Sequence, residues 1–257
     1  MYKTIIYEVE NNVAWLTLNR PDKLNAFTEE MNQEVMQALR SAEKNQEVRC
    51  IVITGSGRAF CSGEDLASVD ENTDHAEFLR TRYNPMIQKI SSIEKPVVAG
   101  VNGVAAGAGM SLSLVCDFRI ASENASFIEA FIHIGLIPDS GSLYYLPRIL
   151  GHAKAMELAV LGEKIKAEEA KNLGLVTSVS PADDFQADLK AFSERLANMP
   201  TKAIGLIKRY LYESWTESLP DMLEKEAYGQ RTAGLTEDHQ EGIKSFMEKR
   251  KPTFVGR

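Results

Sequence analysis

Residues 96–112 read PVVAGVNGVAAGAGMSL, and this stretch decides the fold class. Its first six residues form an apolar run of strand length, which is typical of a strand buried on both faces. Small residues then fill positions 103–109, and an apolar segment continues to Val115. A buried strand that passes through a glycine-rich turn into a helix predicts an α/β fold.

The residues leave two interpretations of this turn open. Small side chains let the backbone approach a ligand, and the unpaired N–H groups at the start of the following helix favour a negative charge. Tight packing of the helix against its neighbours explains many such turns as well. A nucleotide-binding loop is disfavoured, because Gly103, Gly107 and Gly109 give the spacing G-x-x-x-G-x-G, and no G-K-[ST] follows.

The flanking segments support the α/β class. Apolar or alternating runs predict further strands at residues 2–9, 13–18, 50–54, 116–121 and 174–179. Helical patterns predict a helix capped by Thr28, a helix over residues 77–93 that Pro85 kinks, and a helix over residues 167–172.

Strand patterns vanish after Pro200. Helices are expected over residues 201–214, 221–233 and 237–250. We therefore expect a core over residues 1–195 and a helical C-terminal segment over residues 196–257. Ile204, Ile207 and Leu211 form an apolar stripe on this segment, so it should pack on the core or on a neighbouring subunit.

Composition excludes several classes of protein. The chain has 257 residues, of which 44% are hydrophobic, so it can bury a large core. Its net charge of −7 argues against nucleic acid or an anionic membrane as the main partner. Three isolated cysteines and four scattered histidines indicate neither disulfides nor a metal site. We see no secretory signal and no apolar run of about 18 residues, and we expect a cytoplasmic protein.

Two further stretches contain candidate functional residues. In residues 57–66, Gly63 allows a sharp turn that exposes the amide of Glu64, although an ordinary strand-to-loop connection is the alternative. Asp139 follows an apolar run, so it is either a helix N-cap or a carboxylate that faces an apolar pocket. In a pocket, desolvation would raise its pKa and suit it to proton transfer. We interpret His133, with its apolar neighbours, as a core histidine.

Taken together and in this order, these stretches resemble the enoyl-CoA hydratase/isomerase (crotonase) family over nearly the whole chain. The matching pieces are NRP at 19–21 with LNA at 24–26, AFCSG at 59–63 with DL at 65–66, KPVVA at 95–99 with VNG at 101–103, CD at 116–117, GLIP at 135–138, LP at 146–147, GLV at 174–176, and EG at 241–242 with EKR at 248–250. The resemblance implies a spiral of repeated ββα units, and a C-terminal segment used in trimers or dimers of trimers. It also implies a coenzyme A thioester as substrate, with no metal or redox cofactor.

The resemblance further implies which residues form the site. The backbone N–H groups of Glu64 and Ala108 would form an oxyanion hole for a thioester enolate. Coenzyme A would contact Lys23, Leu24, Ala26, Ala59, Ser62, Asp65 and Leu66. Phe246 and Lys249 would reach the coenzyme A of a neighbouring subunit, and residues 67–83 are expected to contribute walls of the acyl pocket.

Two positions depart from the hydratase pattern. Ser111 and Phe131 stand where hydratases carry the two glutamates that hold and activate water. Asp139 instead matches a carboxylate of the dienoyl-CoA and 1,2-epoxyphenylacetyl-CoA isomerases, and the string GLIPDSG looks most like the latter group. Glu129 does not match a catalytic position of the family, so we expect its side chain to be solvated or bonded to a loop.

Three functional hypotheses follow. The favoured one is an isomerase in which Asp139 moves the proton, with ring-enoyl isomerisation in aromatic degradation as its strongest variant and a double-bond shift in linear enoyl-CoAs beside it. The second is an enoyl-CoA hydratase. The third is a protein that binds acyl-CoA without turnover.

Overall fold

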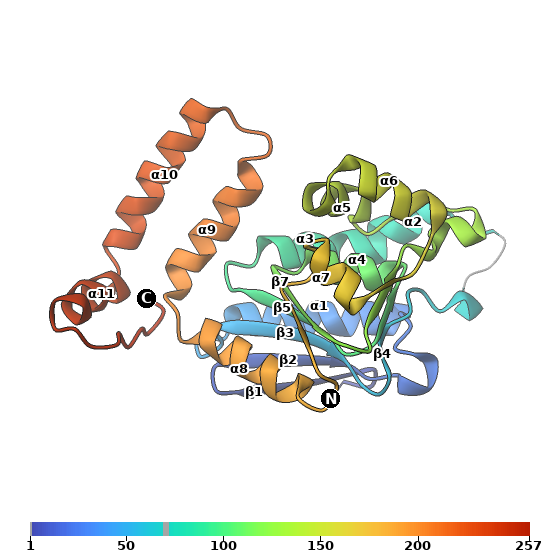
Figure 1. Cartoon of the computed structure of the whole chain (residues 1–257), viewed down its shortest axis with the longest axis horizontal. Helices are drawn as coiled ribbons and strands as arrows, with labels where there is room; N and C mark the ends of the chain where they lie inside the picture. Colours follow the sequence, from blue (N-terminus) through green and yellow to red (C-terminus); the bar gives the residue numbers. More distant parts are fainter. Residues whose placement is uncertain (1, 69–71) are drawn as a thin grey trace.

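The strands form two sheets in the computed structural model, which describes residues 2–68 and 72–257 (Figure 1). The larger sheet has the strand order β1-β2-β3-β5-β7-β10, and the smaller has the order β4-β6-β8-β9. The larger sheet consists of β1 (Ile5–Glu10), β2 (Val13–Leu18), β3 (Cys50–Gly55), β5 (Val97–Val101), β7 (Phe118–Ser122) and β10 (Ser178–Ser180). The smaller consists of β4 (Ala59–Cys61), β6 (Val104–Ala106), β8 (Ser126–Ile128) and β9 (Ile165–Lys166).

Successive strands enter the two sheets in turn. The strands β3, β5 and β7 are parallel neighbours in the larger sheet, whereas β4, β6 and β8, which follow each of them, are parallel neighbours in the smaller sheet. A helical segment follows each pair before the next pair begins. The chain therefore winds as a spiral of ββα units, as the resemblance to the family implies.

Helices cover both faces of the larger sheet (Figure 1). The α-helices of the described residues are α1 (Glu29–Lys44), α2 (His75–Phe78), α3 (Asn84–Ser92), α4 (Ala108–Val115), α5 (Ser142–Leu150), α6 (His152–Leu161), α7 (Ala167–Asn172), α8 (Phe185–Ala197), α9 (Thr201–Glu213), α10 (Leu219–Gly234) and α11 (Glu237–Met247). On β3, Ile51 and Ile53 pack into the core on the side of α1, whereas Cys50 and Val52 pack against α8. The strand is buried on both faces, which explains its continuous apolar sequence.

Two predicted elements differ from the structure. The expected helix over residues 77–93 is divided into α2, a π-helical turn η3 (Leu79–Tyr83) and α3. Pro85, near the start of α3, has no N–H to continue a regular helix across this point. The expected strand at 174–179 is reduced to β10, because the Leu175 N–H donates to the Ala170 carbonyl and closes the end of α7.

The three C-terminal helices extend away from the two sheets, and α11 lies on the opposite side of the molecule from α2 (Figure 1). On α9, Ile207 and Leu211 are 59% and 63% exposed, whereas Ile204 is half-buried. Across residues 2–68 and 72–257, no helix has both the length and the apolar character that crossing a membrane requires.

Candidate active site

Four segments of the chain line a cavity of about 740 Å³. The lining residues lie within 62–66, 75–83, 107–108 and 130–140. Glu64, Ala108 and Asp139, which the resemblance places in the catalytic site, all line this cavity. The second segment confirms that residues 67–83 contribute walls, although residues 69–71 lie outside the described part of the chain. The volume is typical of a small-molecule site.

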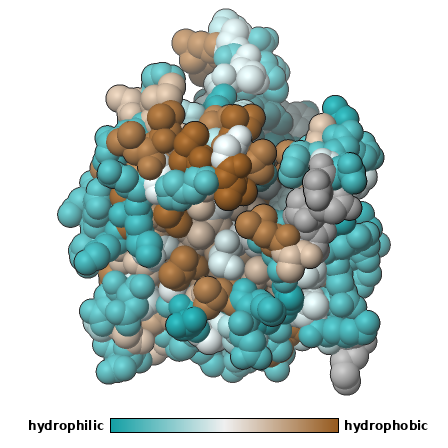
Figure 2. Space-filling model, turned by 90° about the vertical axis from the view of Figure 1, so that its right-hand side faces the viewer, coloured by the Kyte–Doolittle hydropathy of each residue, from teal (hydrophilic) through white to brown (hydrophobic). Residues whose placement is uncertain are grey.

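The rim of the cavity is apolar. Leu66, Ile134 and Ile137 line it and are all more than half exposed. Figure 2 shows hydrophobic residues gathered on the side of the molecule that carries α2. Such a surface can accept the hydrocarbon part of a ligand, because contact with the ligand removes apolar area from water.

The Gly63 turn brings the Glu64 peptide to the cavity. Gly63 has a φ of 96°, in the region that favours glycine. The N–H of Phe27 donates to the Gly63 carbonyl at 2.7 Å, and the Phe27 carbonyl accepts from the N–H of Asp65 at 3.0 Å. Phe27 and Glu64 thus form a parallel bridge, and because successive peptide groups alternate in extended backbone, the Glu64 N–H faces away from Phe27.

Ala108 brings a second amide to the same wall. It is the first residue of α4, so its N–H has no carbonyl acceptor within the helix. A Cβ atom built on Gly63 would lie 3.5 Å from the Ala108 nitrogen and 3.0 Å from the Ala106 oxygen. The Gly63 turn and the start of α4 are therefore in contact, and two amides beside a helix N-terminus can stabilise an anion there.

Asp139 is a cavity carboxylate and not a helix N-cap. The N-cap of α5 is Gly141, and the Asp139 side chain instead accepts a 2.7 Å hydrogen bond from the Ser140 hydroxyl. Burial raises the pKa of Asp139 above its ordinary value, although the Ser140 bond and nearby His75 oppose the rise. A half-buried carboxylate with a raised pKa suits a general base.

The two positions at which hydratases carry glutamates contain no carboxylate. Ser111 is fully buried on α4, and its hydroxyl donates to the Gly107 carbonyl at 3.2 Å. Phe131 lines the cavity, and its ring lies 3.8 Å from where a Cβ atom on Gly107 would be. A hydroxyl that is engaged by the backbone and a phenyl ring cannot together activate water as two carboxylates do.

Of the two states expected for Glu129, solvated or bonded to a loop, the solvated one is wrong, and the side chain is bonded to the first residue of α5. It is 1% exposed, and the Ser142 hydroxyl donates to its Oε1, while Oε2 is buried without a hydrogen-bond partner among the described residues. Burial raises the pKa of Glu129 to about 7, the Ser142 bond opposes this, and the charge of Asp139 adds to it. Sequence reasoning did not predict the burial of this second carboxyl, because its neighbours in sequence do not show which side chains enclose it.

The interpretation of His133 as a core histidine is wrong. Its side chain is exposed and lines the cavity, because it lies on the short 3₁₀ helix η4 (Ala130–Ile134) at the rim. His75, at the start of α2, lines the cavity as well. Among the described residues, no three His, Cys, Asp or Glu side chains are grouped so that they could hold a metal ion.

The residues expected to bind coenzyme A occupy different environments. Ser62 and Leu66 line the cavity, and the Ser62 N–H donates to the Leu24 carbonyl at 3.0 Å, which brings exposed Lys23 close to the cavity. Ala26 and Ala59 are buried, and Asp65 forms a 2.9 Å ion pair with Arg20.

Two further expected contacts lie on the C-terminal side of the chain. Phe246, on α11, is 85% exposed, and Lys249 follows the same helix. Figure 1 places α11 far from α2, so within one chain these residues are remote from the cavity.

Known proteins resemble the chain over its whole length. The Enoyl-CoA hydratase/isomerase family profile matches residues 8–257. A 1,2-epoxyphenylacetyl-CoA isomerase from Escherichia coli is 39% identical, with all of both chains covered. A Rhodobacter capsulatus protein described as "Probable enoyl-CoA hydratase" is 43% identical and covers 100% of this chain and 99% of its own.

A solved structure agrees with these matches. The enoyl-CoA hydratase of Bacillus anthracis superposes with a TM-score of 0.93 at 30% identity, and the alignment covers 99% of this chain and 100% of that one. The spiral fold, the cavity and these whole-length matches lead to one conclusion: the chain belongs to the enoyl-CoA hydratase/isomerase family.

Proposed function

We propose that the protein is an acyl-CoA isomerase that stabilises a thioester enolate and moves one proton with Asp139. The observation that carries this proposal is the placement of Asp139 in one cavity with the amides of Glu64 and Ala108, while Ser111 and Phe131 occupy the hydratase positions. The Escherichia coli relative is described as a 1,2-epoxyphenylacetyl-CoA isomerase, which supports the ring-enoyl variant. A double-bond shift in a linear enoyl-CoA uses the same groups.

In the proposed mechanism, the carboxylate of Asp139 takes a proton from a carbon of the acyl chain. The electron pair of that C–H bond moves toward the thioester carbonyl, whose oxygen becomes negative and accepts hydrogen bonds from the two amides. Asp139 then returns the proton to another carbon, so the product is an isomer of the substrate. The reaction leaves the oxidation state unchanged, so the proposal needs no redox cofactor, and it assigns the stabilisation of the negative oxygen to the two amides instead of a metal.

Hydration is the second candidate, because the Rhodobacter capsulatus relative is described as a hydratase. A hydratase would have to activate water with Asp139 and Glu129 instead of the family's usual pair. Incubation with a 3-enoyl-CoA, a 2-enoyl-CoA and an epoxyphenylacetyl-CoA distinguishes the candidates when the thioesters are separated by liquid chromatography, which resolves isomers, and then weighed by mass spectrometry. Isomerisation changes the structure at constant mass, hydration adds the mass of one water, and binding without turnover changes nothing.

The coenzyme A end is proposed to lie beside Lys23 and Leu24, next to Ser62, with Ala26, Ala59, Asp65 and Leu66 shaping the entrance. A lysine there would attract the phosphates of coenzyme A. Lys23→Glu should weaken the affinity for a CoA thioester at low salt, whereas Lys164→Glu, at an exposed lysine outside this set, should not. If the Lys23 variant binds the CoA thioester as tightly as wild type does, the phosphates of coenzyme A do not bind beside Lys23.

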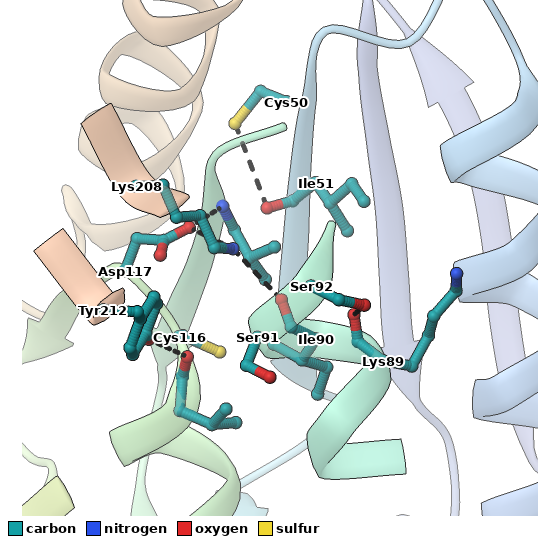
Figure 3. Close-up of polar contacts among 12 residues, drawn as sticks. Cys50, Ile51, Lys89, Ile90, Ser91, Ser92, Cys116, Asp117, Lys208 and Tyr212 are labelled. Carbon is teal, nitrogen blue, oxygen red and sulfur yellow. Dashed lines mark hydrogen bonds and ion pairs between the residues drawn. The ribbon is translucent and has the colours of Figure 1, made fainter. Parts of the chain in front are cut away.

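We further propose that residues 196–257 assemble the chain into a homotrimer or a dimer of trimers around the 1–195 core. The buried ammonium of Lys208 on α9 contacts the Asp117 carboxylate at 2.8 Å and the Ile90 carbonyl at 3.0 Å, which fixes this helix to the core (Figure 3). Exposed Ile207 and Leu211 lie on the same helix and are available to a neighbour. Sedimentation that shows a stable monomer at micromolar concentration would contradict this assembly.

A further inference from the structure

The side chain of Glu64 is tied to the wall of the cavity. The Tyr83 hydroxyl donates a hydrogen bond to Glu64 Oε2, and the Arg82 guanidinium lies 3.8 Å from Oε1. Both donors belong to the π-helical turn η3, which lines the cavity together with α2. The Glu64 side chain is only 14% exposed, so these contacts are shielded from water.

Tyr83 itself is held rigidly. It is 2% exposed, and its ring contacts the Phe27 ring edge-to-face at a centroid distance of 5.5 Å. The Phe78 ring also contacts Tyr83, at a centroid distance of 6.0 Å, and Arg82 lies 4.2 Å from the centre of the Phe78 ring. Phe27 also forms the backbone bridge to Glu64. Tyr83, Phe27 and Glu64 therefore form a closed set of contacts around the Gly63 turn.

This arrangement has an electrostatic consequence. The carboxylate of Glu64 belongs to the same residue as the amide that would receive the enolate oxygen. A free carboxylate near that point would repel the developing negative charge. The Tyr83 hydroxyl draws the carboxylate to the η3 wall, and the Arg82 guanidinium, which also pairs with Glu29 at 3.2 Å, offsets part of its charge. Burial and Glu64 raise the pKa of Tyr83 well above its ordinary value, so its hydroxyl stays protonated and able to donate.

We propose that Tyr83 is a positioning residue that fixes the Glu64 peptide so that its N–H can bind the oxyanion. Tyr83 also holds the Glu64 carboxylate away from the oxyanion, and Arg82 assists as a second side chain that binds this carboxylate. This inference rests on the proposed role of the Glu64 amide. It assigns a function in the reaction to the Glu64 side chain and to η3, which couples the wall of the acyl pocket to the oxyanion hole.

The test measures polarisation of a bound thioester as well as turnover. The probe is 4-dimethylaminocinnamoyl-CoA, whose absorption moves to longer wavelength when its carbonyl accepts strong hydrogen bonds. Tyr83→Phe keeps the buried ring and removes only the hydroxyl. Tyr212→Phe is the matched control, because it removes a half-buried hydroxyl on α9. Arg82→Met provides a second variant at a partly exposed position, in case Tyr83→Phe fails to fold.

Tyr83→Phe should reduce the red shift to less than about half of the wild-type value. It should also lower kcat roughly tenfold and leave KM within about twofold, because a displaced N–H donor stabilises the negatively charged enolate less and affects the neutral bound substrate little. Arg82→Met should reduce the red shift and kcat less than Tyr83→Phe does. Tyr212→Phe should leave both quantities unchanged. In a Glu64→Ala background, the same Tyr83 substitution should have little further effect, since its partner is gone.

Other outcomes overturn the inference. A full red shift in Tyr83→Phe, or losses that add in the Glu64→Ala background, would show that Tyr83 acts only in packing. A wild-type protein that binds the probe without a red shift would overturn both the oxyanion hole and the role of Tyr83. If the red shift behaves as expected but none of the three thioesters is isomerised, the proposed reaction is wrong and the positioning role stands.

Discussion

The hydroxyl of Ser140 donates a 2.7 Å hydrogen bond to Oδ1 of Asp139, the residue before it in the chain. Ser140 is 3% exposed, so this bond lies largely out of water. A hydrogen bond to a carboxylate favours its charged form. The bond therefore moderates the rise in pKa that burial causes at Asp139, and it sets the pH at which the proposed base becomes active.

Ser140→Ala should move the pH–rate profile. Loss of the hydroxyl raises the pKa of Asp139 further, and a base is active only when deprotonated. The acidic limb of kcat/KM should therefore shift to higher pH, while the rate on the alkaline plateau changes little. Ser193→Ala, which removes a buried hydroxyl from α8, is the control and should leave the profile in place. If the acidic limb of kcat/KM does not shift in Ser140→Ala, that limb does not reflect the ionisation of Asp139.

Asp139→Asn should abolish most of the isomerase activity. Removal of a general base typically lowers the rate by about 100-fold or more. The fold should survive, because Asp139 caps no helix and its charged form is disfavoured by burial. Urea unfolding near neutral pH should therefore give an unchanged or higher free energy of unfolding.

Ser111→Ala is the companion to this variant. It removes a buried hydroxyl whose bond is to the backbone of its own helix, so it should retain most of the activity. If Asp139→Asn keeps near wild-type turnover on every accepted substrate, the base lies elsewhere. Glu129 would be the first candidate, since its pKa of about 7 also suits proton transfer.

Several elements could be predicted because short-range patterns determine them. Thr28 caps α1 through a hydrogen bond from the Met31 N–H, and α7 spans the expected residues 167–172. The glycine-rich turn leads into α4 as expected. Each of these depends on residues within one or two turns of the chain.

The surroundings of individual side chains could not be predicted in the same way. Apolar neighbours in sequence surround both Glu129 and His133, yet the first is buried and the second is exposed. The contact of Tyr83 with Glu64 joins residues 19 positions apart and depends on the π-helical turn, which no local pattern indicates. Side-chain burial at such positions is decided by which distant segments pack there.

Glu129→Gln should change how stability depends on pH. Burial raises the pKa of Glu129 from 4.5 to about 7 in the folded protein. Between these pH values, the folded state keeps a proton that the unfolded state has lost, so the wild-type free energy of unfolding falls as pH rises through this window. The glutamine variant has no such group. Relative to wild type, it should gain up to about 3 kcal/mol between pH 4 and pH 8, at about 1.4 kcal/mol per pKa unit.

Isothermal urea unfolding of both proteins at a series of pH values measures this difference. Titrating groups that do not interact with Glu129 are common to both proteins and cancel in the comparison, whereas Asp139, whose charge raises the pKa of Glu129, cancels only in part. Asp183→Asn, at an exposed carboxylate, is the control and should give a curve parallel to wild type. Parallel curves for Glu129→Gln and wild type would mean that Glu129 ionises as an ordinary surface carboxyl does.

Gly109→Ala should destabilise the protein at the junction that positions the two amides. A Cβ atom at position 109 would lie 2.1 Å from the carbonyl oxygen of Cys61, so α4 and β4 would have to move apart. Overpacking of a rigid core typically costs about 1–3 kcal/mol, and backbone atoms yield less readily than side chains. Since β4 leads into the Gly63 turn, separation from α4 should also lower kcat.

Gly234→Ala is the matched control for this substitution. Gly234 is the last residue of α10, and apart from its chain neighbours and the adjacent backbone of its own helix, no described heavy atom lies within 4 Å of its Cβ position. Alanine there should leave stability unchanged or raise it by up to about 1 kcal/mol, because alanine favours helix more than glycine does. Thermal unfolding and turnover of the two variants give the comparison. If Gly109→Ala is as stable and as active as Gly234→Ala, then α4 and β4 can move apart without cost. In that case the contact between them does not set the distance between the Glu64 and Ala108 amides.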